Sequence, residues 1–119
     1  MRQMVTILLV DDDPAQLRTR EMILSSQGWS VQVATNASSA LELLRAGCVG
    51  LVISDHHLEG HSGVDLVKEL RLLHSTLPVL ILTGMPAVED SYAGLNVTIR
   101  FKPLLPDELI QVVKSCISS

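Results

Sequence analysis

Short apolar runs alternate along the chain with segments in which apolar residues recur at helical spacing. The apolar runs predict five strands, at 5–10, 31–34, 51–54, 79–82 and 97–101. The segments between them predict helices, over 14–27, 36–46, 63–74 and from 106 towards the end of the chain. Strands that alternate with helices in this way are typical of a wound α/β sheet with parallel strands.

The balance of polar and apolar residues within each run predicts the order of the strands. The runs at 5–10, 51–54 and 79–82 are apolar on both faces, so they should lie at the centre of the sheet, covered by helices on both sides. The runs at 31–34 and 97–101 mix polar and apolar residues and should lie at the edges. Right-handed crossovers and short connections then favour a single doubly wound, five-stranded parallel sheet in the flavodoxin-like order 2-1-3-4-5.

The connection between the fourth and fifth strands leaves little room for a helix. It lies between Thr83 and Lys102 and is interrupted by Pro86, Gly94 and Asn96. We therefore expect a shortened fourth helix of about eight or nine residues at most.

Composition and charge narrow the class of protein. The chain has 119 residues, of which 47 % are apolar and 3 % aromatic, so residues 1–119 should form one domain with an aliphatic core. The net charge of −4 and the lack of a Lys/Arg cluster in the sequence argue against direct nucleic-acid binding. We expect no membrane span, no secretion signal and no disulfide between Cys48 and Cys116, and hence a cytoplasmic protein.

Functional side chains follow directly after four of the predicted strands. Asp11 and Asp12 follow the first strand and Asp55 follows the third. Thr83 and Lys102 follow the fourth and the fifth. The carboxyl ends of parallel strands share one edge of the sheet, where open α/β sheets bind ligands. The crevice between the first and third strands should therefore bring the three acids together.

Three carboxylates in one place need positive charge. At about 4 Å and an effective dielectric constant near 20, each like-charged pair costs roughly 4 kcal/mol. Oxygen ligands at a shallow site suit Mg²⁺, which shares its remaining positions with waters and phosphate oxygens. With Lys102 opposite and the Thr83 hydroxyl nearby, Asp55 would act as a nucleophile that takes up a phosphoryl group. The competing interpretation, that the acids are ordinary solvated loop residues, is disfavoured by four suitable strand endings at once.

These motifs resemble those of a known family. They are Val10-Asp11-Asp12-Asp13, Asp55 with Gly63 eight residues later, Thr83-Gly84 and Lys102-Pro103. Together they resemble the response-regulator receiver domain, the phosphoacceptor module of two-component signalling, over essentially all of the chain.

The resemblance implies that Asp55 is phosphorylated, that Lys102 pairs with the phosphoryl group and that Thr83 is the switch hydroxyl. It also implies a cis peptide bond between Lys102 and Pro103. The donor would be a phosphohistidine on a histidine kinase or a histidine phosphotransfer protein. The domain would not be an enzyme beyond slow hydrolysis of its own phosphoryl group.

The resemblance further implies a Mg²⁺ site and a surface for partners. Asp12 and Asp55 would bind the metal directly, with Asp11 as the close partner of Asp12. The backbone carbonyl of His57 would supply a further ligand. The face built by the fourth helix, the fifth strand and the fifth helix would bind an output domain or form a homodimer.

Two segments depart from the pattern of the family. Leu58-Glu59 stands where the family often has Met-Pro. Ile99 stands where the family usually carries a Tyr or Phe that rotates inward on activation. We also hypothesise that His57 and Met85 hinder the in-line approach of water to an acyl phosphate and so lengthen its lifetime.

Two other classes of function stay open. A receiver-shaped interaction module that no longer uses phosphate is compatible with Ile99 and the short fourth helix, although the intact Asp12, Asp55, Thr83 and Lys102 argue against it. A small α/β enzyme is more remote, because the sequence contains no Gly-x-Gly-x-x-Gly, P-loop or Gly-x-Ser-x-Gly motif.

Three histidines, at 56, 57 and 61, surround the predicted phosphoacceptor. A transition-metal site would need them on one helix face or converging from a loop. Gly60 and Gly63 interrupt any regular helix there, so we interpret the histidines as exposed loop residues.

Overall fold

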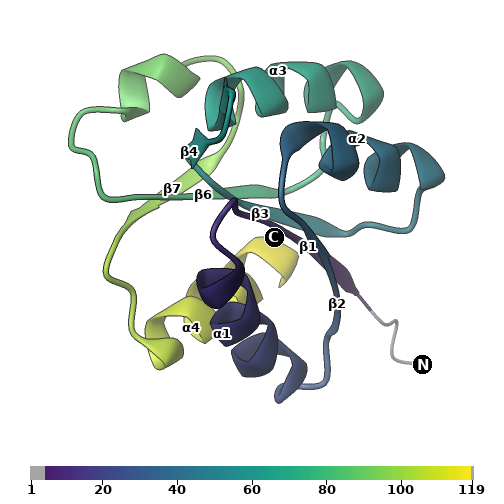
Figure 1. Ribbon diagram of the computed structural model, residues 1–119, viewed down its shortest axis with the longest axis vertical. Helices are drawn as coiled ribbons and strands as arrows, with labels where there is room; N and C mark the ends of the chain where they lie inside the picture. The colour runs from purple at the N-terminus through teal and green to yellow at the C-terminus, as the bar shows by residue number, and fades with distance from the viewer. Residues whose placement is uncertain (1–4, 119) are drawn as a thin grey trace.

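The computed structural model describes residues 5–118 and contains a five-stranded sheet. Its strands are all parallel and lie in the order β2-β1-β3-β6-β7 (Figure 1). They are β1 (Thr6–Val10), β2 (Ser30–Ala34), β3 (Leu51–Asp55), β6 (Val79–Thr83) and β7 (Thr98–Phe101). Counted along the chain, this is the predicted order 2-1-3-4-5, so the doubly wound topology is confirmed.

Helices cover both faces of the sheet (Figure 1). One face carries α2 (Ala37–Ala46) and α3 (Gly63–Leu73), and the other carries α1 (Pro14–Ser25) and α4 (Pro106–Ser118). Side chains along a strand alternate between the faces, so that Leu8 packs in the α2–α3 layer and Leu9 in the α1–α4 layer. The apolar strands therefore lie at the centre because both of their faces are covered.

Side-chain caps fix where the helices begin. Asp13 caps α1 ahead of Pro14, and Asn36 caps α2. Ser62 and Asp65 form a capping box at the start of α3. These signals are local in sequence, and they place the helix starts where the sequence predicts them.

The connection between β6 and β7 contains one 3-10 turn, η1 (Glu89–Tyr92), where the sequence predicts a shortened α-helix. Left-handed backbone angles lie on both sides of it, with φ of 63° at Ala87, 80° at Gly94 and 58° at Asn96. A helix cannot continue through such residues, so the fourth helix is shorter than the eight or nine residues that the spacing allows. The helix expected as the fifth is therefore α4.

A small hairpin that the sequence does not predict lies between β3 and α3. Its strands, β4 (His57–Leu58) and β5 (His61–Ser62), are antiparallel and are joined through Gly60, whose φ is 77°. The hairpin places the segment after Asp55 against the start of α3.

The structure also bears on the expected lack of a membrane-spanning helix and of a disulfide. No helix within residues 5–118 is long and apolar enough to cross a membrane. Cys48 is exposed, Cys116 is buried in the α1–α4 layer, and no disulfide joins them.

Candidate functional site

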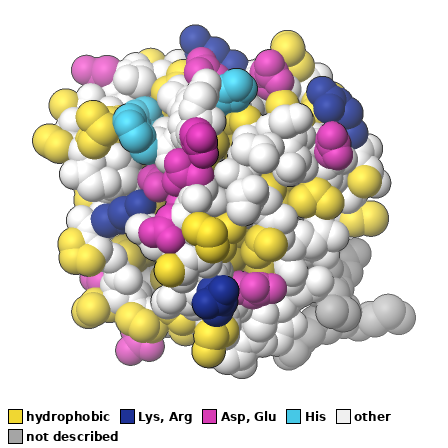
Figure 2. Space-filling model, viewed as in Figure 1, with side chains coloured by type: hydrophobic (Ala, Val, Ile, Leu, Met, Phe, Trp, Pro, Cys, Tyr) yellow, Lys and Arg dark blue, Asp and Glu magenta, His cyan; other side chains and the backbone are white. Residues whose placement is uncertain are grey.

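Three aspartates meet at the carboxyl edge of the sheet, between β1 and β3. Asp11 and Asp12 follow β1, and Asp55 ends the neighbouring β3. One carboxylate oxygen from each lies within 4.8 Å of the other two. Asp11 is 1 % exposed, the Asp55 side chain is 13 % exposed and Asp12 is exposed. Figure 2 shows acidic side chains gathered on this face of the molecule, with basic side chains and histidines beside them.

Asp11 is the most buried member of this acidic trio (Asp11, Asp12 and Asp55). Its Oδ1 accepts the backbone N–H of Asp13 at 2.9 Å, and its Oδ2 pairs with Nη1 of Arg20 at 2.7 Å. Burial raises the pKa of the Asp11 carboxyl above its ordinary value, and the charge of Asp55 acts in the same direction. The two hydrogen bonds and the charge of Arg20 lower this pKa and offset part of the effect.

Lys102 brings a positive charge to Asp55. It follows β7, and its backbone N–H donates to the carbonyl of Thr83 at 2.8 Å, which holds the residue beside the end of β6. Its Nζ lies 3.1 Å from Oδ2 of Asp55. The peptide bond from Lys102 to Pro103 is cis, as the resemblance implies.

Thr83 ends β6, next to the strand that carries Asp55. The residue is 1 % exposed, and its Oγ1 accepts the backbone N–H of Met85 at 3.0 Å. A hydroxyl that accepts one hydrogen bond still carries its own hydrogen. Thr83 can therefore donate to an oxygen placed beside Asp55.

The three histidines near Asp55 differ in where their side chains lie. The backbone N–H of His57 faces Oδ1 of Asp55 at 3.5 Å, while its side chain is exposed. His56 is turned inward, with its Nδ1 2.7 Å from the hydroxyl of Tyr92. His61 hydrogen-bonds through Nδ1 to the carbonyl of Gly60 at 2.6 Å. The three histidines thus do not converge on a common point.

Two residues that the sequence does not single out, Gln16 and Arg20, contact the side chains of the site. Both lie on α1, and Oε1 of Gln16 accepts from Nη2 of Arg20 at 2.8 Å and from Nζ of Lys102 at 3.3 Å. A signal for Arg20 was present, because it shares a helix face with the core residues Leu17 and Leu24. A charge at such a position needs a buried partner, and Asp11 is that partner.

The acidic trio has the chemistry of a hard-cation site. Within residues 5–118 it is the one group of three or more His, Cys, Asp or Glu side chains close enough to share a metal ion. All of its donor atoms are carboxylate oxygens, which suit Mg²⁺ better than softer transition metals. The exposure of Asp12 leaves room for waters and for a phosphate oxygen.

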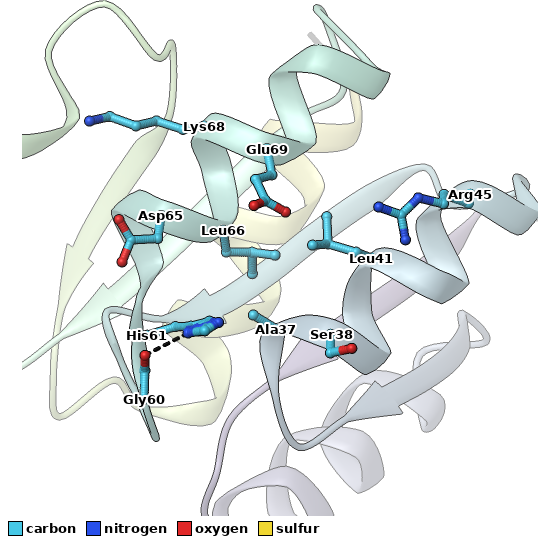
Figure 3. A pocket seen from close by; sticks show the side chains of 10 residues that line it. All are labelled: Ala37, Ser38, Leu41, Arg45, Gly60, His61, Asp65, Leu66, Lys68 and Glu69. Atoms are coloured by element: carbon cyan, nitrogen blue, oxygen red, sulfur yellow. Dashed lines mark hydrogen bonds between the residues drawn. The ribbon is translucent and has the colours of Figure 1, made fainter.

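A separate groove of about 720 Å³ lies between α2 and α3 (Figure 3). Leu41 and Leu66 line it together with charged residues of both signs, Arg45, Asp65, Lys68 and Glu69. It contains none of the acidic trio, so it is distinct from the site built on Asp55.

The fold and the site together define a doubly wound α/β domain whose acidic crevice is suited to a divalent cation and an oxyanion. The family model of the response regulator receiver domain matches residues 7–114 of this chain. The chain therefore belongs to the response regulator receiver domain family of two-component signalling.

Two transcriptional regulatory proteins are similar to this chain in sequence. The chain is 41 % identical over 94 residues to the protein named "Probable transcriptional regulatory protein TcrX" of Mycobacterium tuberculosis. The aligned segment covers 79 % of this chain and 40 % of that protein. The chain is 34 % identical over 110 residues to the transcriptional regulatory protein GlrR of Escherichia coli, which is 90 % of this chain and 25 % of that protein. The chain thus spans less than half the length of these curated relatives.

Among solved structures, a response regulator receiver protein from Sinorhizobium medicae has a TM-score of 0.87 and 26 % identity, covering 98 % of this chain and 97 % of that one. The chemotaxis protein CheY4 of Vibrio cholerae has a TM-score of 0.89 and 24 % identity, covering 96 % and 99 %. This second likeness concerns the fold alone.

Membership of the family brings its general properties. Receiver domains accept a phosphoryl group as their standard function, and they bind Mg²⁺ at the acidic pocket. Response regulators work with histidine kinases and often carry output domains.

Proposed function

We propose that Asp55 is the phosphoacceptor of this receiver domain, and that residues 1–119 act as one cytoplasmic domain switched by phosphorylation. The observation that carries the proposal is the position of Asp55. Its carboxylate lies between the acids that follow β1 and the ammonium of Lys102, which is 3.1 Å away. A nucleophile, a metal-type acid pair and a cation are thereby gathered at one carboxylate group.

The reaction is a transfer from a phosphohistidine of a histidine kinase or phosphotransfer protein. A carboxylate oxygen of Asp55 attacks phosphorus, and the O–P bond forms as the P–N bond breaks. The electron pair of the P–N bond returns to the donor imidazole, which takes up a proton. The product is an acyl phosphate on Asp55.

Each neighbouring side chain has a role in this step. Asp12 and Asp55, with the His57 carbonyl and with Asp11 beside them, would hold Mg²⁺, which supplies charge neutralisation for the phosphoryl oxygens. Lys102 moves from its ion pair with Asp55 to a phosphoryl oxygen, because formation of the acyl phosphate removes the charge of the carboxylate. The Thr83 hydroxyl donates its hydrogen to another phosphoryl oxygen.

We infer that the side chains of His57 and Met85 slow hydrolysis of the acyl phosphate. Both side chains are exposed, and Met85 is 49 % exposed. Met85 lies two residues beyond Thr83, to whose hydroxyl its amide is bonded. We infer that these side chains hinder in-line water. A phosphorylated lifetime of only seconds, measured by loss of the acyl phosphate, would contradict this inference.

The test uses Mg²⁺ and acetyl phosphate, with intact mass spectrometry to detect the added phosphoryl group. The unmodified chain should be labelled, and Asp55→Asn should not be, because an amide is not a nucleophile towards phosphorus. The matched control is Asp107→Asn, an exposed acid in the first turn of α4, which should be labelled at the normal rate. Equal labelling of Asp55→Asn would refute the assignment.

A second candidate is a receiver-like interaction module that does not use phosphate. Two observations favour it: Ile99 is aliphatic and only partly buried on β7, and η1 is a single turn. A folded chain that binds Mg²⁺ but takes no phosphoryl group, either from acetyl phosphate or from a phosphorylated kinase, would decide for this alternative.

A further inference from the structure

We propose that Arg20 is a built-in counter-ion of the acidic crevice, which competes with the divalent cation for Asp11 and weakens the binding of Mg²⁺. The inference rests on the proposed function in one respect, namely that the acidic trio binds a divalent cation. It gives Arg20 a part in setting the Mg²⁺ concentration at which the domain becomes able to accept a phosphoryl group.

Both carboxylate oxygens of Asp11 are already engaged. Oδ2 pairs with Nη1 of Arg20 at 2.7 Å, and Oδ1 accepts the N–H of Asp13 at 2.9 Å. Each oxygen keeps a second lone pair, so a metal ion that bound Asp11 directly would either lie beside the donor already there or displace it. The backbone N–H belongs to the N-terminal cap of α1, so the Arg20 side chain is the one that can leave.

The position of Arg20 is fixed from two sides. The residue lies on the face of α1 that also carries Leu17 and Leu24, and its side chain is only 15 % exposed. One guanidinium nitrogen reaches Asp11, and the other donates to Oε1 of Gln16 at 2.8 Å, one helical turn earlier. An arginine held by two partners in this way is preorganised for its carboxylate.

Gln16 connects this pair to the other cation of the site. Its Oε1 also accepts from Nζ of Lys102 at 3.3 Å, while Lys102 pairs with Asp55 at 3.1 Å. Two positive charges therefore face two of the three acids. The five charged groups carry one net negative charge, so the crevice attracts a divalent cation far less than three free carboxylates would.

A groove beside Arg20 can accept its guanidinium group if a metal ion displaces it from Asp11. This groove has a volume of about 590 Å³ and is lined by Gln16, Thr19, Ile23 and Lys102 among others. Rotation of the side chain into this groove would free Oδ2 of Asp11 without disturbing the core. Whether Arg20 rotates away or stays beside the metal ion, its charge opposes Mg²⁺ binding, and its removal should strengthen that binding.

The experiment is isothermal titration calorimetry of the full chain with MgCl₂. Arg20→Gln should bind Mg²⁺ about tenfold more tightly than the unmodified chain, because one positive charge has left the crevice. The matched control is Arg18→Gln, which removes the same charge from an exposed position of the same helix. Because solvent and salt screen that position, its Mg²⁺ affinity should change by less than about twofold.

A second variant guards against a folding defect. Arg20→Leu extends the apolar face of Leu17 and Leu24 and should show the same gain in affinity. If both Arg20 variants fold and bind Mg²⁺ no more tightly than the unmodified chain and Arg18→Gln, the proposal is overturned. If no variant binds Mg²⁺ at all, the metal site of the proposed function fails as well. If Mg²⁺ binding and labelling of Asp55 are intact and the affinities are equal, the role of Arg20 alone fails.

Discussion

At the scale of single residues, Gly63 shows how tightly the surroundings of Asp55 are packed. Its backbone N–H donates to the carbonyl of His56 at 2.6 Å. A Cβ at this position would overlap the hydroxyl of Tyr92 and would lie 3.1 Å from the carbonyl oxygen of Asp55. The hydroxyl is bonded to His56 and the carbonyl is backbone, so neither can move aside cheaply. The site therefore needs glycine here for space.

We expect Gly63→Ala to lower the free energy of unfolding by about 1–3 kcal/mol, the range typical of overpacked positions. Urea denaturation followed by circular dichroism measures this loss. Gly84→Ala is the control, because a Cβ there meets nothing within 4 Å. The substitution at Gly63 should cost less in a Tyr92→Phe background, which lacks the hydroxyl. An equal cost in both backgrounds would show that the overlap with Tyr92 is not the cause.

The site residues differ in whether the sequence around them predicts their place in the site. Asp11, Asp12 and Asp55 were predictable because each ends an apolar run, and the topology of parallel strands carries such residues to one edge. Arg20 was not predicted, although its place on the core face of α1 was visible in the sequence. The partner of Arg20 depends on the rotation of α1 against the sheet, which periodicity alone does not fix.

At the scale of elements, the connection from β6 to β7 is held by α3 as well as by its own turn. Arg71, on α3, donates to the carbonyls of Leu95 and Asn96 at 2.9 Å each. It also donates to Leu77 at 2.7 Å and to His74 at 3.2 Å. One guanidinium thus fastens the start of β7 and the end of α3 together, and its burial lowers the pKa of Arg71.

Arg71→Ala should lower the free energy of unfolding by about 2–4 kcal/mol, because several carbonyls lose a charged donor at once. Arg71→Lys should recover only part of the loss, since an ammonium cannot span the carbonyls as a planar guanidinium does. Lys68→Ala, at an exposed position of the same helix, serves as the control for loss of charge. Chemical denaturation measures all three, and equal stability of Arg71→Ala and Lys68→Ala would contradict the assignment.

Elements with a clear period or cap were predictable from the sequence. Of the two irregular ones, the hairpin was not predicted, and for η1 only a shortened helix was predicted, not a single 3-10 turn. The hairpin of β4 and β5 has two residues in each strand, too few for an alternating pattern to be read. The turn η1 is short because Ala87 and Asn96 adopt left-handed backbone angles. Such an angle at an alanine cannot be predicted from the sequence. Tyr92 is 3 % exposed, so η1 owes its place to tertiary packing.

At the scale of the whole molecule, the strand order was predictable because the polarity of each strand indicates how deeply that strand is buried in the sheet. A strand covered by helices on both faces must be apolar on both faces, and three strands meet that condition. The two core layers follow directly from the alternation of Leu8 and Leu9 along β1. The network of Arg20, Gln16 and Lys102 crosses between α1 and the end of β7, and no local pattern encodes such a contact.

Tyr92 links the stability of the whole fold to alkaline pH. It is the single tyrosine of the sequence, and it belongs to the core layer under α2 and α3. Burial raises the pKa of its hydroxyl well above the ordinary value of 10.0, and the charges of Asp55 and Asp65 raise it further. The folded state therefore holds this proton more tightly than the unfolded chain does.

The sign of the pH dependence follows from that difference. Below about pH 10 both states keep the tyrosine proton, and Tyr92 adds no pH dependence. Above that pH the unfolded chain loses the proton first, so the free energy of unfolding falls by about 1.4 kcal/mol per pH unit. Urea denaturation of the unmodified chain and of Tyr92→Phe isolates this contribution: the difference between them should be constant near neutral pH and change with this slope above pH 10. Tyrosinate absorbance should appear only as circular dichroism reports unfolding, and its appearance near pH 10 in a folded chain would contradict the prediction.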